Sequence, residues 1–150
     1  MKNILKTTFA LFFTGVMVTS CDSYKDTDTP DKFVEPDKNL SGVWQLTKVK
    51  RNSIDITSSM DFSQFRLHLN SDNSYELENR LPFPVETDGK WIVDDVTHPF
   101  QLTFHENDAT NGVDVAIQYP IVEGQRQLTI THSPGCRSNK YEYVFVKANR

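Results

Sequence analysis

The chain has 150 residues, with 20 acidic and 16 basic side chains and a net charge of −4. This length favours a single domain. The acidic balance argues against duplex nucleic acid as a partner, because phosphate binding needs clustered Lys and Arg.

The first element is an apolar leader over residues 1–20. Lys2 and Lys6 precede an apolar stretch from Thr7 to Val18. A basic start followed by a short apolar run is typical of a secretory signal peptide, and the run is too short to span a bilayer as a mature helix.

The leader ends in Val18-Thr19-Ser20-Cys21. This tetrapeptide resembles the bacterial lipobox, in which small residues precede a cysteine that is acylated on sulfur before the leader is removed. The resemblance implies that Cys21 carries acyl chains such as palmitate and begins the mature protein; the alternative is an ordinary secretory leader. Two or more chains would anchor the protein stably, since each buried methylene contributes about 0.8 kcal/mol.

Residues 21–39 follow as a lipidated cysteine and an acidic tether. Residues 22–39 contain six Asp and Glu and two Pro, and only Phe33 and Val34 are strongly apolar. Such a segment cannot bury enough surface to offset its conformational entropy, which predicts disorder. Acids directly after the cysteine resemble a signal for the outer face of the outer membrane in some Gram-negative lineages and for inner-membrane retention in others. We expect an outer-membrane lipoprotein, periplasmic or surface-exposed.

From Leu40 to residue 150 the pattern changes to short alternating runs separated by turn residues, which is typical of half-buried strands and not of helices. The clearest hairpin turns at Ser71-Asp72-Asn73. In the first run Val49 is out of phase with Trp44 and Leu46, which predicts a β-bulge. The inward positions expected in these runs are Trp44, Leu46, Phe65, Leu67, Leu69, Tyr75, Leu77, Phe100, Leu102, Phe104, Val113, Val115, Ile117, Leu128, Ile130, Tyr141, Tyr143 and Phe145.

With a short strand at Ile54 and Ile56, the count is eight or nine strands joined by short loops. The sequence therefore predicts an all-β, antiparallel up-and-down meander. An open sheet of this length would leave two bare edges, so the meander should close into a barrel, with a β-sandwich as the alternative.

The opening run "LSGVWQL" resembles the Gly-x-Trp that begins the first strand of lipocalins, with Gly42 and Trp44 in the motif positions. Together with the lipobox, the acidic tether, the "GKW" strand start and the terminal "YEYVFVK", it resembles small lipocalin-like bacterial lipoproteins of unknown function. The last strand carries Lys147 where lipocalins place an Arg over the tryptophan.

This resemblance implies an eight-stranded barrel and a binding role. Residues that could line a pocket in its mouth are Phe65, Leu67, Tyr75, Phe100, Phe104, Tyr143 and Phe145. Large aromatic side chains mostly fill space, so Trp44 is interpreted first as a core residue that closes one end of the barrel. Eight strands can be filled completely by side chains, which would leave no pocket.

The sequence offers little catalytic chemistry. His132 and Cys136 flank a turn and supply two possible metal ligands, fewer than a zinc site needs, so we expect no metal and no other cofactor. The loop 105–112 is rich in oxygen-bearing side chains, but Ala109 occupies a position where an EF-hand needs a ligand. Asp94 and Asp95 are adjacent, so they would face opposite sides of a strand and make no acid and base pair. We expect no enzyme.

Two binding hypotheses remain open. The first is a carrier that holds a small apolar ligand in the barrel mouth. The second is a surface module with a filled core that presents loops such as 80–90 and 105–112 to an envelope protein or a glycan. A measured cavity would separate them.

Overall fold

The computed structural model describes residues 34–148. The chain divides into two compact units, Met1–Val34 and Glu35–Arg150. The leader, Cys21 and most of the expected tether therefore lie outside the described residues. The second unit holds ten strands, β1 Gly42–Arg51, β2 Ile54–Asp55, β3 Arg66–Leu69, β4 Ser74–Glu78, β5 Gly89–Val93, β6 Gln101–Glu106, β7 Val113–Gln118, β8 Ile121–Val122, β9 Gln125–His132 and β10 Tyr141–Lys147.

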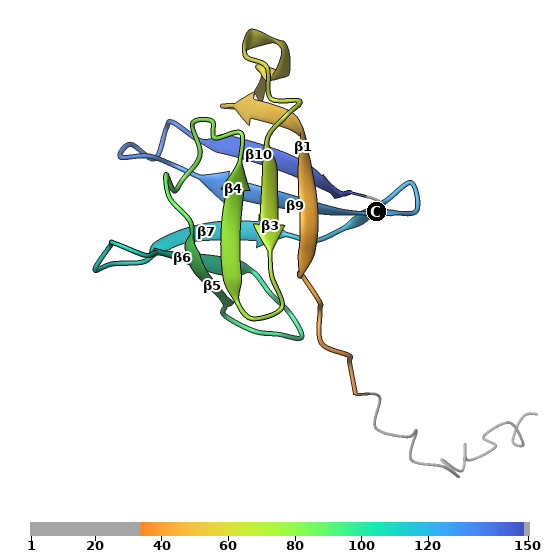
Figure 1. The fold of residues 1–150 in the computed structure, drawn as a ribbon. Helices are drawn as coiled ribbons and strands as arrows, with labels where there is room; N and C mark the ends of the chain where they lie inside the picture. Colours follow the sequence, from red (N-terminus) through yellow and green to blue (C-terminus); the bar gives the residue numbers. More distant parts are fainter. Residues whose placement is uncertain (1–33, 149–150) are drawn as a thin grey trace, which may run out of the picture. The chain divides into compact units, whose positions relative to one another are not determined.

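Eight of these strands form a closed antiparallel barrel. The order β10-β1-β3-β4-β5-β6-β7-β9 is closed by the pairing of β9 with β10, and β2 and β8 are short additions to β1 and β9. Figure 1 shows β1, β3 and β4 crossing in front of β7, β9 and β10. The expected all-β meander is confirmed as a barrel, an arrangement consistent with a lipocalin-like fold. Because the ladder closes on itself, the sandwich alternative is wrong.

The alternating apolar pattern explains which side chains fill the barrel. In β3 and β4 the buried residues Leu67, Leu69, Tyr75 and Leu77 alternate with half-buried or exposed polar ones. The predicted bulge is present, since the pairing of β1 with β10 shifts between Leu46 and Lys48. This shift restores Val49 to the interior, where it is buried.

The β7–β9 hairpin extends past the barrel rim. Pro120 interrupts the ladder between β7 and β8, and the Gln127 N–H still donates to the Pro120 carbonyl oxygen at 2.9 Å. The turn is made by Glu123 and Gly124, both with positive φ. Residues 119–126 therefore project from the rim as a narrow finger (Figure 1).

The barrel has two rims, which the strand directions define. The tether rim carries residues 35–41, the β3–β4 turn, the β5–β6 loop 94–100, the hairpin finger 119–126 and the end of β10. The far rim carries the β1–β3, β4–β5, β6–β7 and β9–β10 connections. Residues 35–39, expected as tether, belong to the folded unit, since the Lys38 N–H donates to the Val96 carbonyl oxygen and the Tyr119 hydroxyl donates to the Asn39 carbonyl oxygen.

The wall is weakest between β4 and β5. Only Ser74 with Lys90 and Tyr75 with Gly89 pair there in the part of the chain that the structure describes. A Cβ atom added at Gly89 would lie 2.0 Å from the His105 carbonyl oxygen, so only glycine allows β5 to approach β6 this closely. The connection 79–88 folds over the resulting gap.

The expectation for one aromatic residue is corrected. Phe100 is 71% exposed and does not face inward, because β6 begins at Gln101 and the Asp94 carboxylate accepts from the backbone N–H groups of Phe100 and Gln101. Trp91, in the "GKW" strand start, is buried, and its indole N–H donates to the Asn70 carbonyl oxygen.

Candidate functional site

The barrel interior is occupied by the side chains that the sequence offered as a pocket lining. Of the seven candidates, Phe65, Leu67, Tyr75, Phe104, Tyr143 and Phe145 are buried together in one apolar cluster. Phe100 is the exception, as described above. The six remaining residues thus converge from β3, β4, β6 and β10 and from the residue before β3 into one buried apolar cluster, in which Phe65 packs near Phe145 and Tyr75 packs on Phe104.

The aromatic ring of Phe83 completes this filling. It packs against four core rings, with centroid separations of 5.3 Å to Phe65 and Tyr143, 5.8 Å to Phe104 and 6.1 Å to Phe145. Edge-to-face contacts of this kind stabilise a core beyond simple burial of area. Phe83 lies in the β4–β5 connection, so a loop residue occupies the centre of the barrel mouth.

We call residues 79–88 the plug. Two side chains hold it from the barrel wall. The Tyr143 hydroxyl donates to the Pro82 carbonyl oxygen at 3.1 Å. The Glu106 Oε1 atom accepts from the backbone N–H groups of Glu86 and Thr87 at 2.7 and 2.8 Å.

These contacts alter the acid–base properties of both residues. The N–H groups of Glu86 and then Thr87 hold the pKa of Glu106 below its ordinary value, because they stabilise the carboxylate. Burial raises the pKa of Tyr143 to about 12, so its hydroxyl stays protonated and can donate.

Sequence patterns did not identify the plug. The run "LPFPV" has no strand period, and its two prolines only indicated a loop. The signal that could have found it is an aromatic residue between two prolines, in a loop where an exposed phenylalanine has no local reason to occur.

One polar atom inside the barrel has no partner. The Tyr75 hydroxyl is buried and makes no hydrogen bond to any of residues 34–148. Its ring packs edge-to-face on Phe104, with 4.9 Å between centroids. Burial, with smaller contributions from Glu106 and Asp88, raises the pKa of Tyr75, so the group is a neutral hydroxyl. A buried hydroxyl without a partner is costly, which marks this position as the most polar point of an apolar interior.

Trp44 closes the tether rim. It is fully buried, its indole N–H donates to the Leu40 carbonyl oxygen at 2.8 Å, and Tyr119 packs on its edge. Lys147 pairs with Trp44 across β1 and β10 and places its Nζ atom 5.7 Å from the ring centroid. Lysine thus takes the position over the tryptophan, as a cation–π partner.

Gly42 is required for the same contact. Its φ is +143°, and an added Cβ atom would lie 2.5 Å from the Lys147 Cε atom. The Gly-x-Trp motif therefore has a structural role at this rim.

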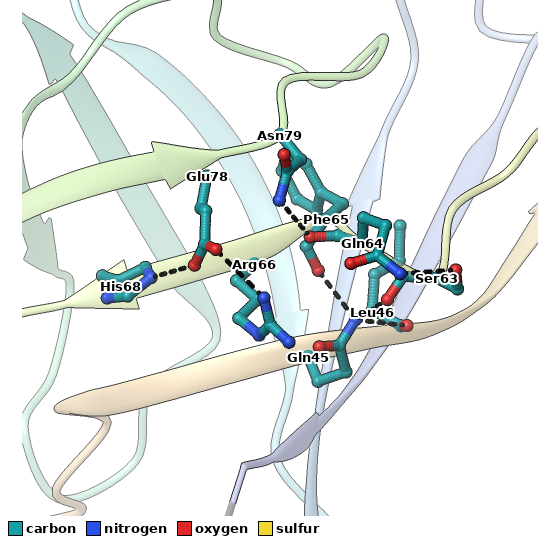
Figure 2. Close-up of polar contacts among 9 residues, drawn as sticks. All are labelled: Gln45, Leu46, Ser63, Gln64, Phe65, Arg66, His68, Glu78 and Asn79. Carbon is teal, nitrogen blue, oxygen red and sulfur yellow. Dashed lines mark hydrogen bonds and ion pairs between the residues drawn. The ribbon is translucent and has the colours of Figure 1, made fainter.

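The outer face of β1, β3 and β4 carries a polar network, drawn in Figure 2. Glu78 accepts from Arg66 at 3.0 Å and lies 3.1 Å from the His68 Nε2 atom. The Gln45 amide donates to the Ser63 and Phe65 carbonyl oxygens at 2.6 and 3.0 Å. His68 faces outward, and the network ties neighbouring strands together; its residues Gln45 and Ser63 border a surface hollow of about 520 Å³.

The remaining polar candidates are dispersed. No group of three or more His, Cys, Asp or Glu within residues 34–148 is arranged to hold a metal ion. Burial lowers the pKa of His132, and a hydrogen bond from Ser138 lowers the pKa of the exposed Cys136. Asp94 and Asp95 are each occupied by backbone N–H groups of the β5–β6 loop.

Four surface hollows are lined by described residues. The largest of the four, about 630 Å³, lies at the tether rim beside Gly42 and Lys147, and the smallest, about 420 Å³, lies beside Phe83 on the plug. None of the four is lined by Tyr75, Phe104 or Phe145, so they do not open into the barrel interior. In the same part of the chain no helix is long and apolar enough to cross a membrane.

These observations define a closed antiparallel β-barrel domain around one buried apolar cluster. The chain matches the family "Domain of unknown function (DUF5004)" over residues 22–146 and belongs to that family. Neither the curated proteins nor the solved structures contain a match.

Proposed function

We propose that this protein is a lipocalin-like lipoprotein of the cell envelope, anchored in the outer membrane by acyl chains on Cys21, whose barrel is a non-catalytic interaction module. The observation that carries the module is the filled interior: Phe83 occupies the space where a ligand would lie. Recognition of a protein or glycan then falls to the far-rim loops. Loop 107–112 supports this proposal, because all its residues are exposed.

The anchor is tested with Cys21→Ser. We expect the parent protein to carry an acyl mass at its N-terminus and to fractionate with membranes, and the variant to be released. Equal amounts of parent and variant in the membrane fraction would contradict the anchor.

The interaction module is tested by photocrosslinking in cells. Benzophenone side chains placed at Asp108 and Asn111 should crosslink to an envelope component. The matched control is Glu76, which is also exposed but lies on the outer face of β4. Crosslinks of the same species and yield from all three positions would contradict loop recognition.

The unpartnered Tyr75 hydroxyl favours a second candidate function, a carrier of a small apolar ligand with one hydrogen-bond acceptor. Such a ligand would enter only if the plug moved Phe83 aside. Native mass spectrometry of protein purified from its own cells separates the two: a bound small molecule supports the carrier, and a ligand-free mass supports the module.

A further inference from the structure

Exposed apolar side chains are concentrated at the tether rim. Val96, Phe100, Ile121 and Val122 are 54%, 71%, 61% and 40% exposed, and all four lie in the β5–β6 loop or the hairpin finger. At the far rim, the large exposed apolar side chains among the described residues are Ile54 and Met60.

The chain enters the folded unit between these two apolar elements. The Lys38 N–H donates to the Val96 carbonyl oxygen, the Glu35 carboxylate lies 3.0 Å from the His98 Nε2 atom, and the Asn39 carbonyl oxygen accepts from the Tyr119 hydroxyl at 2.9 Å. The first residues of the unit therefore lie beside the β5–β6 loop and the base of the finger.

Distance along the chain limits what this rim can meet. Residues 22–34 separate Cys21 from Glu35, and thirteen residues span at most about 45 Å. If Cys21 carries acyl chains, as the proposed function holds, the tether rim stays close to the bilayer surface.

The chemistry of the rim fits a lipid surface. Tyr119 and Arg126 lie at the base of the finger, where the Arg126 guanidinium is 4.6 Å from the Tyr119 ring centroid. Aromatic and arginine side chains with apolar stems are favoured at the headgroup level. Of the six carboxylates of the rim, Glu35, Asp72, Asp94 and Asp95 are paired with local donors, and Asp37 and Glu123 are exposed.

We propose that the tether rim docks on the bilayer, with Phe100 and the finger residues Ile121 and Val122 inserted at the boundary between headgroups and acyl chains. Four partly exposed side chains give only weak affinity by themselves. The anchor makes the contact intramolecular and so raises the local concentration of lipid at the rim. Docking holds the barrel with its plug and far-rim loops pointing away from the membrane.

The experiment uses the full-length lipoprotein reconstituted in phosphatidylcholine vesicles whose acyl chains carry bromine, which quenches tryptophan on contact. Phe100→Trp reports on the tether rim, and Ile54→Trp is the matched control, because Ile54 is 69% exposed at the far rim. Trp44 and Trp91 are buried and give the same background in both variants. We expect the emission of Trp at position 100 to be blue-shifted and quenched by the vesicles. At position 54 we expect no quenching beyond the background of Trp44 and Trp91. Equal quenching at both positions, or none at either, would overturn the proposal.

A second measurement separates this proposal from the anchor. The unlipidated full-length Cys21→Ser chain is mixed with the same vesicles at high lipid concentration. We expect weak binding that falls about tenfold or more when Phe100 and Ile121 are both replaced by Asp, since two apolar contacts are lost. Binding unchanged by that replacement would overturn rim docking even if Cys21 is acylated. A third outcome is that the emission of Trp at position 100 shifts to the blue with rising protein concentration when no vesicles are present. The rim would then bind a second copy of the chain, and this result would also overturn docking on the bilayer.

Discussion

The two rims of the barrel are each closed by an aromatic side chain, but the closing groups differ in origin. At the tether rim Trp44 is part of β1, hydrogen-bonds four residues back to Leu40 and lies under its cross-strand partner Lys147. At the far rim Phe83 is part of a loop and depends on Tyr143, which meets Pro82 from 61 positions away in the chain.

This difference separates a permanent closure from one that can open. Trp44 cannot leave the core without disrupting the first strand, whose ladder joins β10 to β3. Phe83 can leave while the strands stay paired, if its ring contacts, the burial of Val85 and the hydrogen bonds to Tyr143 and Glu106 are given up. Local opening of this kind costs less than global unfolding. We therefore expect the tether rim to determine stability and the far rim to determine access to the interior.

The largest effect should come from the tether rim. Trp44→Ala removes a fully buried indole and should cost about 3 to 5 kcal/mol of unfolding free energy. Against a total of about 5 to 15 kcal/mol, this could leave the protein unfolded at growth temperature. A denaturant melt measures the loss, and Trp44→Phe, which keeps most of the apolar area, should remain folded. A Trp44→Ala variant as stable as the parent would mean that Trp44 lines an accessible space.

At the far rim, Phe83→Ala should have a smaller effect on stability. Phe83 is only partly buried, so we expect a loss of about 2 kcal/mol, together with a new space beside Phe65, Phe104 and Tyr143. An apolar fluorescent dye should then bind the folded variant and not the parent. Pro82→Ala, which leaves the Phe83 ring in place, is the control. A loss as large as that of Trp44→Ala, without dye binding, would remove the contrast between the rims.

The sequence predicted the two rims unequally, for a physical reason. Trp44, Phe65 and Tyr75 lie in alternating runs, and alternation follows directly from strand geometry, so their burial could be predicted. Phe83 is partly buried by contacts with Phe65, Phe104 and Tyr143, which come together only after the barrel closes. The prediction for Phe100 was wrong for the opposite reason, because the alternation was extended back beyond the first residue of β6 into a loop fixed by Asp94. The family match and the structure leave the anchor and the binding partner as proposals.

The cation–π contact at the tether rim should contribute less than either ring. Lys147→Met removes the charge over Trp44 but keeps much of the apolar stem, and we expect a loss of about 0.5 to 1 kcal/mol. Lys147→Arg should keep the contact and lose little, because a guanidinium also packs on an indole. Equal losses from both variants would show that side-chain shape matters here and charge does not.

The smallest effect, and the one most specific to the plug, should depend on pH. The pKa of Glu106 is lower in the folded protein than its ordinary value of 4.5. The carboxylate therefore stabilises the plug fully at pH values above 4.5, and this stabilisation is lost as the pH falls through the lower pKa of the folded state. Acid should therefore loosen the plug, and Glu106→Gln should loosen it at every pH.

The measurement is the hydrogen-exchange protection of the Glu86 and Thr87 amides, whose N–H groups donate hydrogen bonds to Glu106. The Thr97 and His98 amides, which donate to Asp95, are the matched control, because acid affects their acceptor too but Glu106→Gln does not. At pH 6 we expect less hydrogen-exchange protection of the Glu86 and Thr87 amides in Glu106→Gln than in the parent. At acid pH the protection of these amides should fall further in the parent but hardly at all in the variant, and Thr97 and His98 should behave alike in both proteins. If protection at Glu86 and Thr87 were the same in both proteins at pH 6, Glu106 would not hold the plug, and the far rim would be as permanently closed as the tether rim.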